Sequence, residues 1–162
     1  MKTLIDHINE ALKIGKNISS FSAYSCQPAN KDELKEIIKK RIKQDGPDCD
    51  LNDIDVSLIT DMSFLFNESK FTGNISNWDT SNVNDMCGMF KGSNFNCDIS
   101  KWDVSNVNDM TNMFRFSKFN QDISNWDVSG WKYTDVDDAI NVFSDCNIKE
   151  KFKPIALQNL DV

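Results

Sequence analysis

The chain has 162 residues, 40% of them hydrophobic, and a formal net charge of −7 at pH 7. This length corresponds to one domain, and the hydrophobic fraction argues against a disordered chain. Residues 51–131 hold 5 Lys and Arg against 11 Asp and Glu, so this acidic stretch disfavours nucleic acid and anionic membranes as partners.

Residues 1–16 are predicted to form a short amphipathic helix, because Leu4, Ile8 and Leu12 fall on one helical stripe that Gly15 ends. The segment resembles leader segments in predicted proteins of gut bacterial phages and mobile elements. It lacks the apolar region of a signal peptide, and no lipobox cysteine occurs near residue 20. Because the chain also has no apolar run long enough to span a membrane, we expect a cytoplasmic protein.

Residues 17–49 are predicted to hold a linker and a second helix. Asn30 and Glu33 match a capping box at the start of this helix, and Gly46 with Pro47 ends it. An apolar face is formed by Leu34, Ile37, Ile38 and Ile42, and a basic face by Lys35, Lys39, Lys40, Arg41 and Lys43. We interpret the basic face as the solvated side of a helix that caps the domain; the alternative is a patch for nucleic acid or membrane.

Residues 50–148 contain a sequence that returns every 24 residues. Ile75-Ser76-Asn77-Trp78-Asp79 reappears as Ile99-Ser100-Lys101-Trp102-Asp103 and again as Ile123-Ser124-Asn125-Trp126-Asp127. A fixed period of this size is typical of a solenoid, whose units bury their apolar faces only against their neighbours. A first copy with conservative changes begins near Leu51, and a divergent last copy at 138–143 follows an insertion of about five residues at 130–134.

Within each repeat the pattern predicts one short strand and one short helix. Val107, Met110, Met113 and Phe114 have the spacing of one helical stripe, whereas residues 96–100 alternate polar and apolar side chains. We therefore expect an α/β fold: a right-handed, leucine-rich-repeat-like solenoid of short parallel strands and short helices with N-terminal capping helices. Residues 149–162 are expected to form a C-terminal tail or cap.

The repeat Phe-Asn-x-Asp-Ile-Ser-x-Trp-Asp-Val-Ser-Asn-Val-x-Asp-Met-x-x-Met-Phe resembles that of the BspA-like leucine-rich-repeat surface proteins. The resemblance covers about residues 50–148 and is strongest over 95–129. That family comprises bacterial surface proteins and lipoproteins, mostly of unknown ligand. The resemblance therefore implies binding or adhesion and a surface location, and it supplies no catalytic residues.

The recurring tryptophans Trp78, Trp102 and Trp126 are interpreted as core residues, because the first copy carries the aliphatic Ile54 at the same position. The alternative is a platform on which a carbohydrate stacks. A core position accepts such an exchange between two apolar side chains, whereas a stacking platform requires an aromatic ring in each repeat.

The recurring aspartates form a ladder of like charges. We predict that each carboxylate accepts hydrogen bonds from the backbone of its own turn, which relieves their repulsion. A ladder of calcium sites is the alternative, although the Gly-rich Asp loop of calcium-binding solenoids is absent. The residues concerned are Asp55, Asp79, Asp103 and Asp127.

No catalytic constellation is recognisable in the sequence. The only histidine is His7, and the chain has no Gly-rich phosphate loop and no nucleophile motif. Five cysteines without paired spacing are predicted to be free thiols rather than metal ligands. We therefore predict a non-enzymatic protein with no cofactor and no metal.

A binding surface is predicted on the outward side of the expected strands, because an inward Ile99 places Asp98 and Ser100 outward. This row comprises Asn74, Ser76, Asp98, Ser100, Asp122 and Ser124, with Trp131 and Tyr133 at its C-terminal end. The two aromatic residues either extend the surface or cover the last repeat as a cap. The leading hypothesis is a monomeric module that binds a basic or polar protein partner through this row. The alternative is an adhesin-like surface protein that binds host matrix or glycan.

Overall fold

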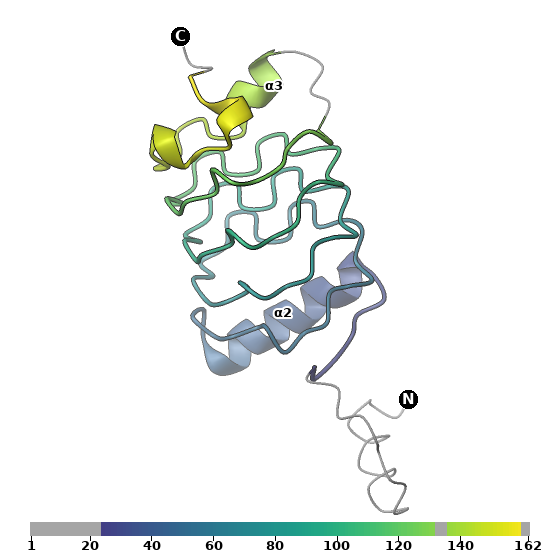
Figure 1. Ribbon diagram of the computed structural model, residues 1–162. Coiled ribbons are helices and arrows are strands. Elements are labelled where there is room, and N and C mark those ends of the chain that lie inside the picture. Colours follow the sequence, from purple (N-terminus) through teal and green to yellow (C-terminus); the bar gives the residue numbers. More distant parts are fainter. Residues whose placement is uncertain (1–23, 132–135, 160–162) are drawn as a thin grey trace, which may run out of the picture.

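The computed structural model describes residues 24–131 and 136–159 (Figure 1). The helix predicted over 1–16 lies outside these residues. Their helices are the α-helices α2 (Lys31–Asp45) and α3 (Val136–Asn141) and the 3₁₀ helices η1 (Glu150–Phe152) and η2 (Ile155–Leu157). No helix in this part of the chain combines the length and the hydropathy that a membrane span requires.

The α/β solenoid expected from the sequence is wrong. Residues 24–131 and 136–159 contain no strand, and no helix lies within residues 51–131. Parallel pairing is limited to isolated bridges, such as those of Asp85 with Asp61 and with Asp109. Each repeat is instead a coil of consecutive turns, and the coils lie one above another in a column (Figure 1).

The expected helix is replaced by a layer of turns, because the backbone donors of this segment bond to the next coil. The N–H groups of Met86, Gly88 and Phe90 each donate to a carbonyl 23 residues later, at 2.9 Å. An α-helix would use these donors for carbonyls four residues earlier. We call residues 62–68, 86–92 and 110–116 the turn layer. Two positions of each coil have positive φ, at Phe64, Glu68, Gly88, Gly92, Asn112 and Phe116.

The core between the two sides of the column consists of stacked aromatic rings. Phe90 lies 5.6 Å from Phe66 and 5.5 Å from Phe114, measured between ring centroids. Trp78 and Trp102 stack at 6.3 Å, and Trp102 contacts Phe90 at 6.1 Å. We call residues 74–79, 98–103 and 122–127 the tryptophan layer. Because its tryptophans meet the phenylalanines of the turn layer, the exposed side chains of the two layers face opposite directions.

The prediction that the tryptophans are core residues is confirmed. Trp78 and Trp102 are each 4% exposed and Trp126 is 6% exposed. The indole N–H of Trp102 donates to the carbonyl of Ile75 in the preceding coil at 3.1 Å. The rings are therefore not accessible as a platform for carbohydrate.

α2 lies across the N-terminal end of the column (Figure 1). The predicted start and end of this helix are confirmed. The Asn30 side chain accepts the Glu33 N–H at 3.0 Å, and Gly46 ends the helix with φ 95°. Leu34 and Ile38 are buried in the core. The helix thus covers the apolar edge that the first coil would otherwise expose.

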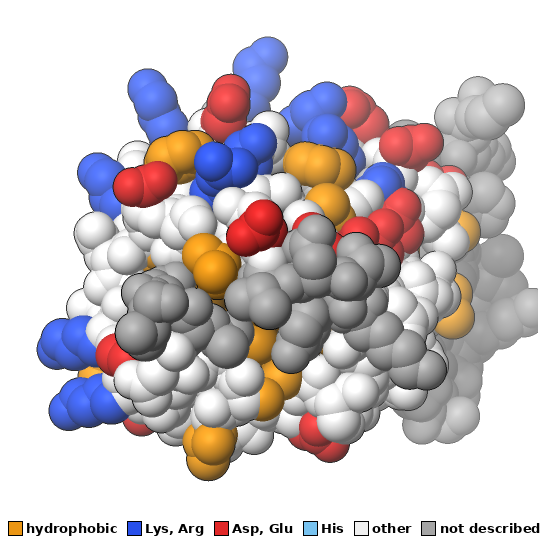
Figure 2. All heavy atoms as spheres, turned by 90° about the horizontal axis from the view of Figure 1, so that it is seen from above, with side chains coloured by type: hydrophobic (Ala, Val, Ile, Leu, Met, Phe, Trp, Pro, Cys, Tyr) orange, Lys and Arg blue, Asp and Glu red, His pale blue; other side chains and the backbone are white. Residues whose placement is uncertain are grey.

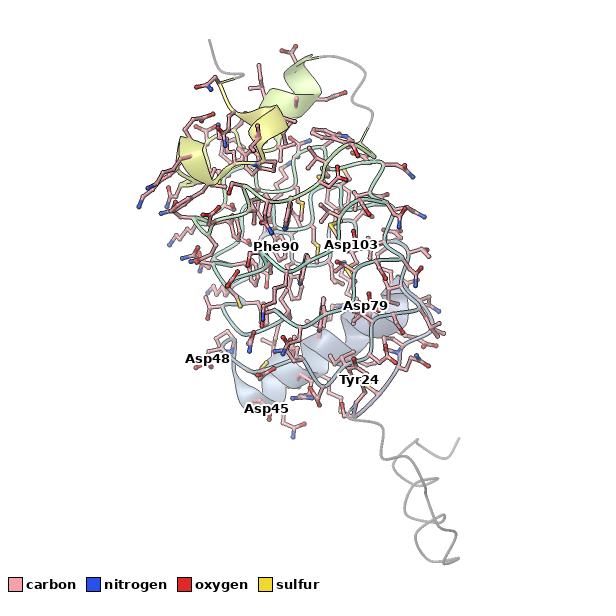
Figure 3. All side chains as sticks on the ribbon, in the orientation of Figure 1. Tyr24, Asp45, Asp48, Asp79, Phe90 and Asp103 are labelled. Carbon is pink, nitrogen blue, oxygen red and sulfur yellow. The ribbon has the colours of Figure 1, made fainter. Side chains whose placement is uncertain are left out.

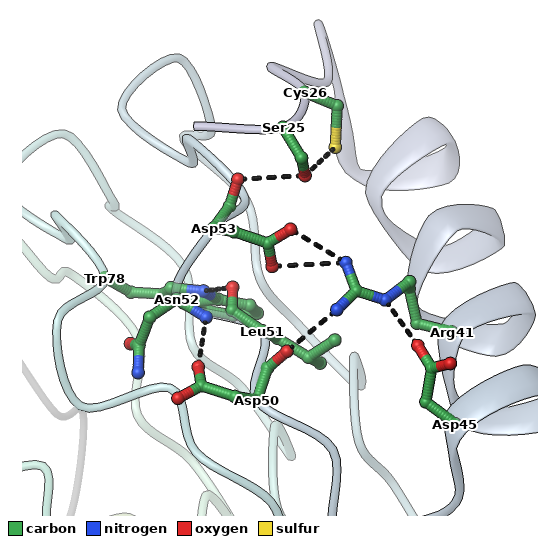
Figure 4. A network of polar contacts seen from close by, with 9 residues as sticks. All are labelled: Ser25, Cys26, Arg41, Asp45, Asp50, Leu51, Asn52, Asp53 and Trp78. Atoms are coloured by element: carbon green, nitrogen blue, oxygen red, sulfur yellow. Dashed lines mark hydrogen bonds and ion pairs between the residues drawn. The ribbon is translucent and has the colours of Figure 1, made fainter. Parts of the chain in front are cut away.

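Two basic residues of α2 attach the helix to the first coil rather than project into solvent. The guanidinium of Arg41 donates to the Asp53 carboxylate at 2.9 and 3.1 Å and to the Asp50 carbonyl at 3.0 Å (Figure 4). Lys31 lies 2.6 Å from Asp61. Charge pairing therefore fixes the orientation of a helix whose burial comes from its apolar face.

The C-terminal end of the column continues the repeat after the insertion. Phe143 stacks on Phe114 at 5.7 Å, as the alignment of the divergent copy requires, and the Phe114 N–H donates to the Val142 carbonyl. Segments around η1 also join this end, since the Ile123 N–H donates to the Phe152 carbonyl. Seen from this end, Lys and Arg side chains lie along the upper and left edges of the view, with Asp and Glu side chains among them (Figure 2).

Candidate interaction surface

The predicted surface residues occupy turns on the exposed side of the tryptophan layer. Asp98 accepts the Ser100 N–H at 2.9 Å, and Asp122 accepts the Ser124 N–H at 3.0 Å. Asn74 makes the same turn with Ser76 one coil earlier, at 3.1 Å. We call these six residues the Asp98 row. Its residues are at least partly exposed, as expected, but they lie on turns and not on strands.

Four members of the Asp98 row line an open groove. The remaining lining comes from Gln121 and Asn125, and the Asn125 amide donates to the Ser100 carbonyl of the preceding coil at 3.0 Å. Asn74 and Ser76 lie outside the groove. The residues that the structure brings together are Asp98, Ser100, Gln121, Asp122, Ser124 and Asn125.

Trp131 contributes to the C-terminal cap. It is 6% exposed and lies with Leu157 in the lining of an apolar hollow that shares Ser124 and Asn125 with the groove. Its burial favours the cap over an exposed anchor for a partner. Tyr133 lies outside the described residues.

Hydrogen bonds lower the pKa of both groove carboxyls below the ordinary value for aspartate. The backbone N–H and hydroxyl of Ser100 lower the pKa of Asp98, and the hydroxyl and N–H of Ser124 lower the pKa of Asp122. Lys101 supplies a nearby positive charge that acts on Asp98 in the same direction. Both carboxyls are therefore ionised well below neutral pH, and the groove is negative.

A second row of turns carries the aspartate ladder noted in the sequence. Asp103 accepts both the N–H and the hydroxyl of Ser105, at 3.0 and 2.6 Å, and Asp79 binds Ser81 in the same way. Figure 3 shows Asp79 and Asp103 on successive coils. The predicted turn role is confirmed. We call this ladder of Asp55, Asp79, Asp103 and Asp127 the Asp103 row.

The hydrogen bonds of these turns predict how the free energy of unfolding depends on pH. The Ser105 hydroxyl and N–H lower the pKa of Asp103, as Ser100 does for Asp98. A carboxyl with a lower pKa in the folded chain adds stability above its unfolded pKa of about 3.9, and that stability is lost as the pH falls through the folded pKa. We expect the free energy of unfolding to be level from about pH 7 to pH 5 and to decrease below about pH 4.

Urea denaturation between pH 7 and pH 2.5 measures this profile. The matched control is Asp98→Asn with Asp103→Asn, which keeps two turn acceptors and removes two titrating groups, so its decrease should be shallower. A stability maximum near pH 3 would contradict the assignment.

The structure also locates the sulfur and metal candidates. All five cysteines are free thiols, as predicted. Within residues 24–131 and 136–159, no group of three His, Cys, Asp or Glu side chains is arranged to hold a metal ion.

Sequence reasoning missed Gln121 and Asn125 as groove residues. Asn125 could have been found from the sequence, because Asn77 occupies the same position of an earlier repeat. The bond from the Asn125 amide to the Ser100 carbonyl depends on the spacing between coils, which only the stacked structure defines.

The repeats and α2 together match a known family. No curated protein and no solved structure matches the chain. The family model described as "Mycoplasma protein of unknown function, DUF285" matches residues 33–153, which span nearly all of α2, every repeat and η1. Because this match covers well over half of the sequence, the chain belongs to the DUF285 family.

Proposed function

We propose that the chain is a non-enzymatic, monomeric module that binds a basic or polar segment of a protein partner in the groove of the Asp98 row. The observation that carries the proposal is the pair of ionised carboxylates, Asp98 and Asp122, held by turns in an open groove. Extended surfaces formed by successive repeats are the usual binding surfaces of stacked-repeat proteins.

The turn geometry suits this role because it orients each carboxylate before a partner arrives. Oδ1 of Asp98 accepts the Ser100 N–H, and Oδ1 of Asp122 accepts the Ser124 N–H. The second oxygen of each carboxylate is then directed by the turn and suits a Lys or Arg donor. An orientation fixed in advance reduces the entropy lost on binding.

Neutralising the two groove carboxylates should lower the affinity for a basic ligand several-fold, with a larger effect at low salt. The best change is Asp98→Asn with Asp122→Asn, because Asn74 already makes the same turn with Ser76. The substitution therefore removes charge and retains the turn. Fluorescence anisotropy with a labelled Lys- and Arg-rich peptide, at two salt concentrations, measures the effect.

The matched control neutralises two aspartates of the other row. Asp79→Asn with Asp103→Asn makes the same change of charge in the same kind of turn, outside the groove lining. If both double variants lose affinity equally, the peptide responds to net charge alone and the groove is not the site. Unchanged affinity in the groove variant would also reject the proposal.

The resemblance of residues 95–129 to the BspA-like repeat supports a second candidate, an adhesin-like surface protein that binds host matrix or glycan. The hydroxyl and amide groups of Ser100, Ser124 and Asn125 in the groove suit sugar hydroxyls as well as peptide groups. For the protein-binding module proposed first, we also propose a cytoplasmic location. Cell fractionation with a glycan array distinguishes the two: recovery at the cell surface with saturable glycan binding would favour the adhesin.

A further inference from the structure

Two phenylalanines of the turn layer are exposed on a backbone conformation that favours glycine. Phe64 has φ 56° and is 46% exposed, and Phe116 has φ 58° and is 53% exposed. Positive φ is a genuine outlier for a bulky residue. The neighbouring coil carries glycine at both equivalent positions, Gly88 and Gly92, with φ 57° and 65°. The backbone path therefore accepts glycine, and core packing does not account for these rings.

The coil between the two rings carries glycine at both equivalent positions, but only Gly92 is exposed. A Cβ atom on Gly88 would lie 2.5 Å from the Phe64 ring, so that ring rests directly on the glycine. Gly88 is therefore buried beneath Phe64. Gly92 instead offers exposed backbone, in the coil between Glu68, whose Cγ would lie 3.4 Å from a Cβ atom on Gly92, and Phe116. Apolar rings that border exposed backbone are suited to contact an extended peptide.

Basic residues recur in and just after the turn-layer segments that carry these rings. Of the five Lys and Arg in residues 51–131, only Lys101 belongs to the tryptophan layer. The other four lie within or just after the turn-layer segments, where Glu68 is the accompanying acid: Lys70, Lys91, Arg115 and Lys118. Asp61, Asp85 and Asp109 lie at the opposite end of the layer and accept backbone N–H groups of their own turns.

Arg115 links the basic and aromatic parts of this surface. Its guanidinium lies 4.9 Å from the centroid of the Phe116 ring, and its Nη1 donates to Asn112 at 3.3 Å. In the described part of the chain its buried Nε has no hydrogen-bond partner. The buried Nε cannot reach a partner, so a carboxylate would pair with the terminal nitrogens of this ring-supported guanidinium.

We propose that the turn layer is a second interaction surface, which binds an acidic peptide segment with apolar side chains. The apolar side chains pack on the exposed rings of Phe64 and Phe116, and the carboxylates pair with Lys91, Arg115 and Lys118. Charge complementarity selects this occupant. A symmetric pair of copies is disfavoured because it would bring the Lys and Arg side chains of this surface against one another. The inference is independent of the proposed function, since the two surfaces belong to opposite layers.

The decisive variant is Phe116→Gly, because it should remove binding without unfolding the chain. Glycine occupies this conformation at Gly92 in the preceding coil, so we expect an unchanged or higher melting temperature. The probe is a fluorescein-labelled peptide of alternating Glu and Leu. The full chain should bind it saturably, and Phe116→Gly should weaken binding about tenfold or more.

Two matched controls test the electrostatic part. Lys118→Glu should lower the affinity for the acidic peptide several-fold, with a larger effect at low salt. Lys101→Glu, the same change on the tryptophan layer, should leave the affinity unchanged. A peptide with Lys in place of Glu can bind the groove of the Asp98 row, so its affinity should not change in Phe116→Gly.

Four results would overturn the proposal. They are absence of binding by the unmodified chain, unchanged affinity of Phe116→Gly for the acidic peptide, equal losses for Lys118→Glu and Lys101→Glu, and an equal loss of affinity for the Lys peptide in Phe116→Gly. Sedimentation adds a separate outcome. If the chain forms a dimer that Phe116→Gly abolishes, and if it does not bind the acidic peptide, this surface binds a second copy of the chain and the peptide proposal is rejected.

Discussion

Replacing Trp102 with alanine should lower the free energy of unfolding by about 3–5 kcal/mol, a large part of the roughly 5–15 kcal/mol of a typical domain. The ring is 4% exposed, stacks on Trp78 at 6.3 Å and contacts Phe90 at 6.1 Å. Its loss leaves a cavity between coils. It also leaves the Ile75 carbonyl without the indole donor, which places the effect toward the upper end of the range.

Urea denaturation of Trp102→Ala beside Lys101→Ala measures this effect. Lys101 is exposed and adjacent in sequence, so its truncation should change stability by no more than about 0.5 kcal/mol. Trp102→Phe retains a stacked ring and removes the indole N–H, so it separates packing from the hydrogen bond. Small and equal losses for the two alanine variants would contradict the buried position of the indole.

Removing residues 1–49 should cause self-association, because it strips the apolar edge of the first coil of its cover. The deletion removes α2 with its buried Leu34 and Ile38, and it removes the Cys49 carbonyl that accepts the Asn74 N–H. Stacked-repeat proteins without a polar terminal cap expose such an edge and aggregate. Size-exclusion chromatography over a range of protein concentrations measures the result.

A pair of point variants tests the same cap without truncating the chain. Leu34→Asp places a carboxylate at a position that is 0% exposed, and should cost about 4 kcal/mol or more. Lys35→Asp changes the neighbouring exposed residue and should have little effect. A truncated chain that stays monomeric and folded would mean that α2 is an appendage, and its basic face would then be the better candidate for function.

Features that depend on local chemistry could be predicted from the sequence. The bounds of α2 follow from Asn30 and Gly46, because capping and helix termination involve only neighbouring residues. The turn role of the aspartates follows from Asp103 and Ser105 for the same reason, since the donor lies two residues from the acceptor. The burial of Trp102 follows from the repeat itself, because two periods align it with the aliphatic Ile54.

The path of the backbone could not be predicted in this way. Val107, Met110 and Met113 have helical spacing, yet the same spacing arises when consecutive turns put every third residue inward. Hydrogen bonds to the next coil and positive φ at Asn112 distinguish the two cases. Both depend on a neighbouring coil that is remote in sequence, so side-chain periodicity alone favoured a helix that does not form.

The two proposed binding surfaces also depend partly on the sequence and partly on the tertiary structure. The sequence by itself determined the 24-residue register, and with it the alignment of Asp98 with Asp122, because the repeat is visible in the residues themselves. Only the tertiary structure decided that Trp131 is buried in the C-terminal cap, that Phe64 covers Gly88, and that the rings of Phe64 and Phe116 are exposed. The physical reason is that exposure and φ depend on how one coil packs against the next, and residue type does not encode either quantity.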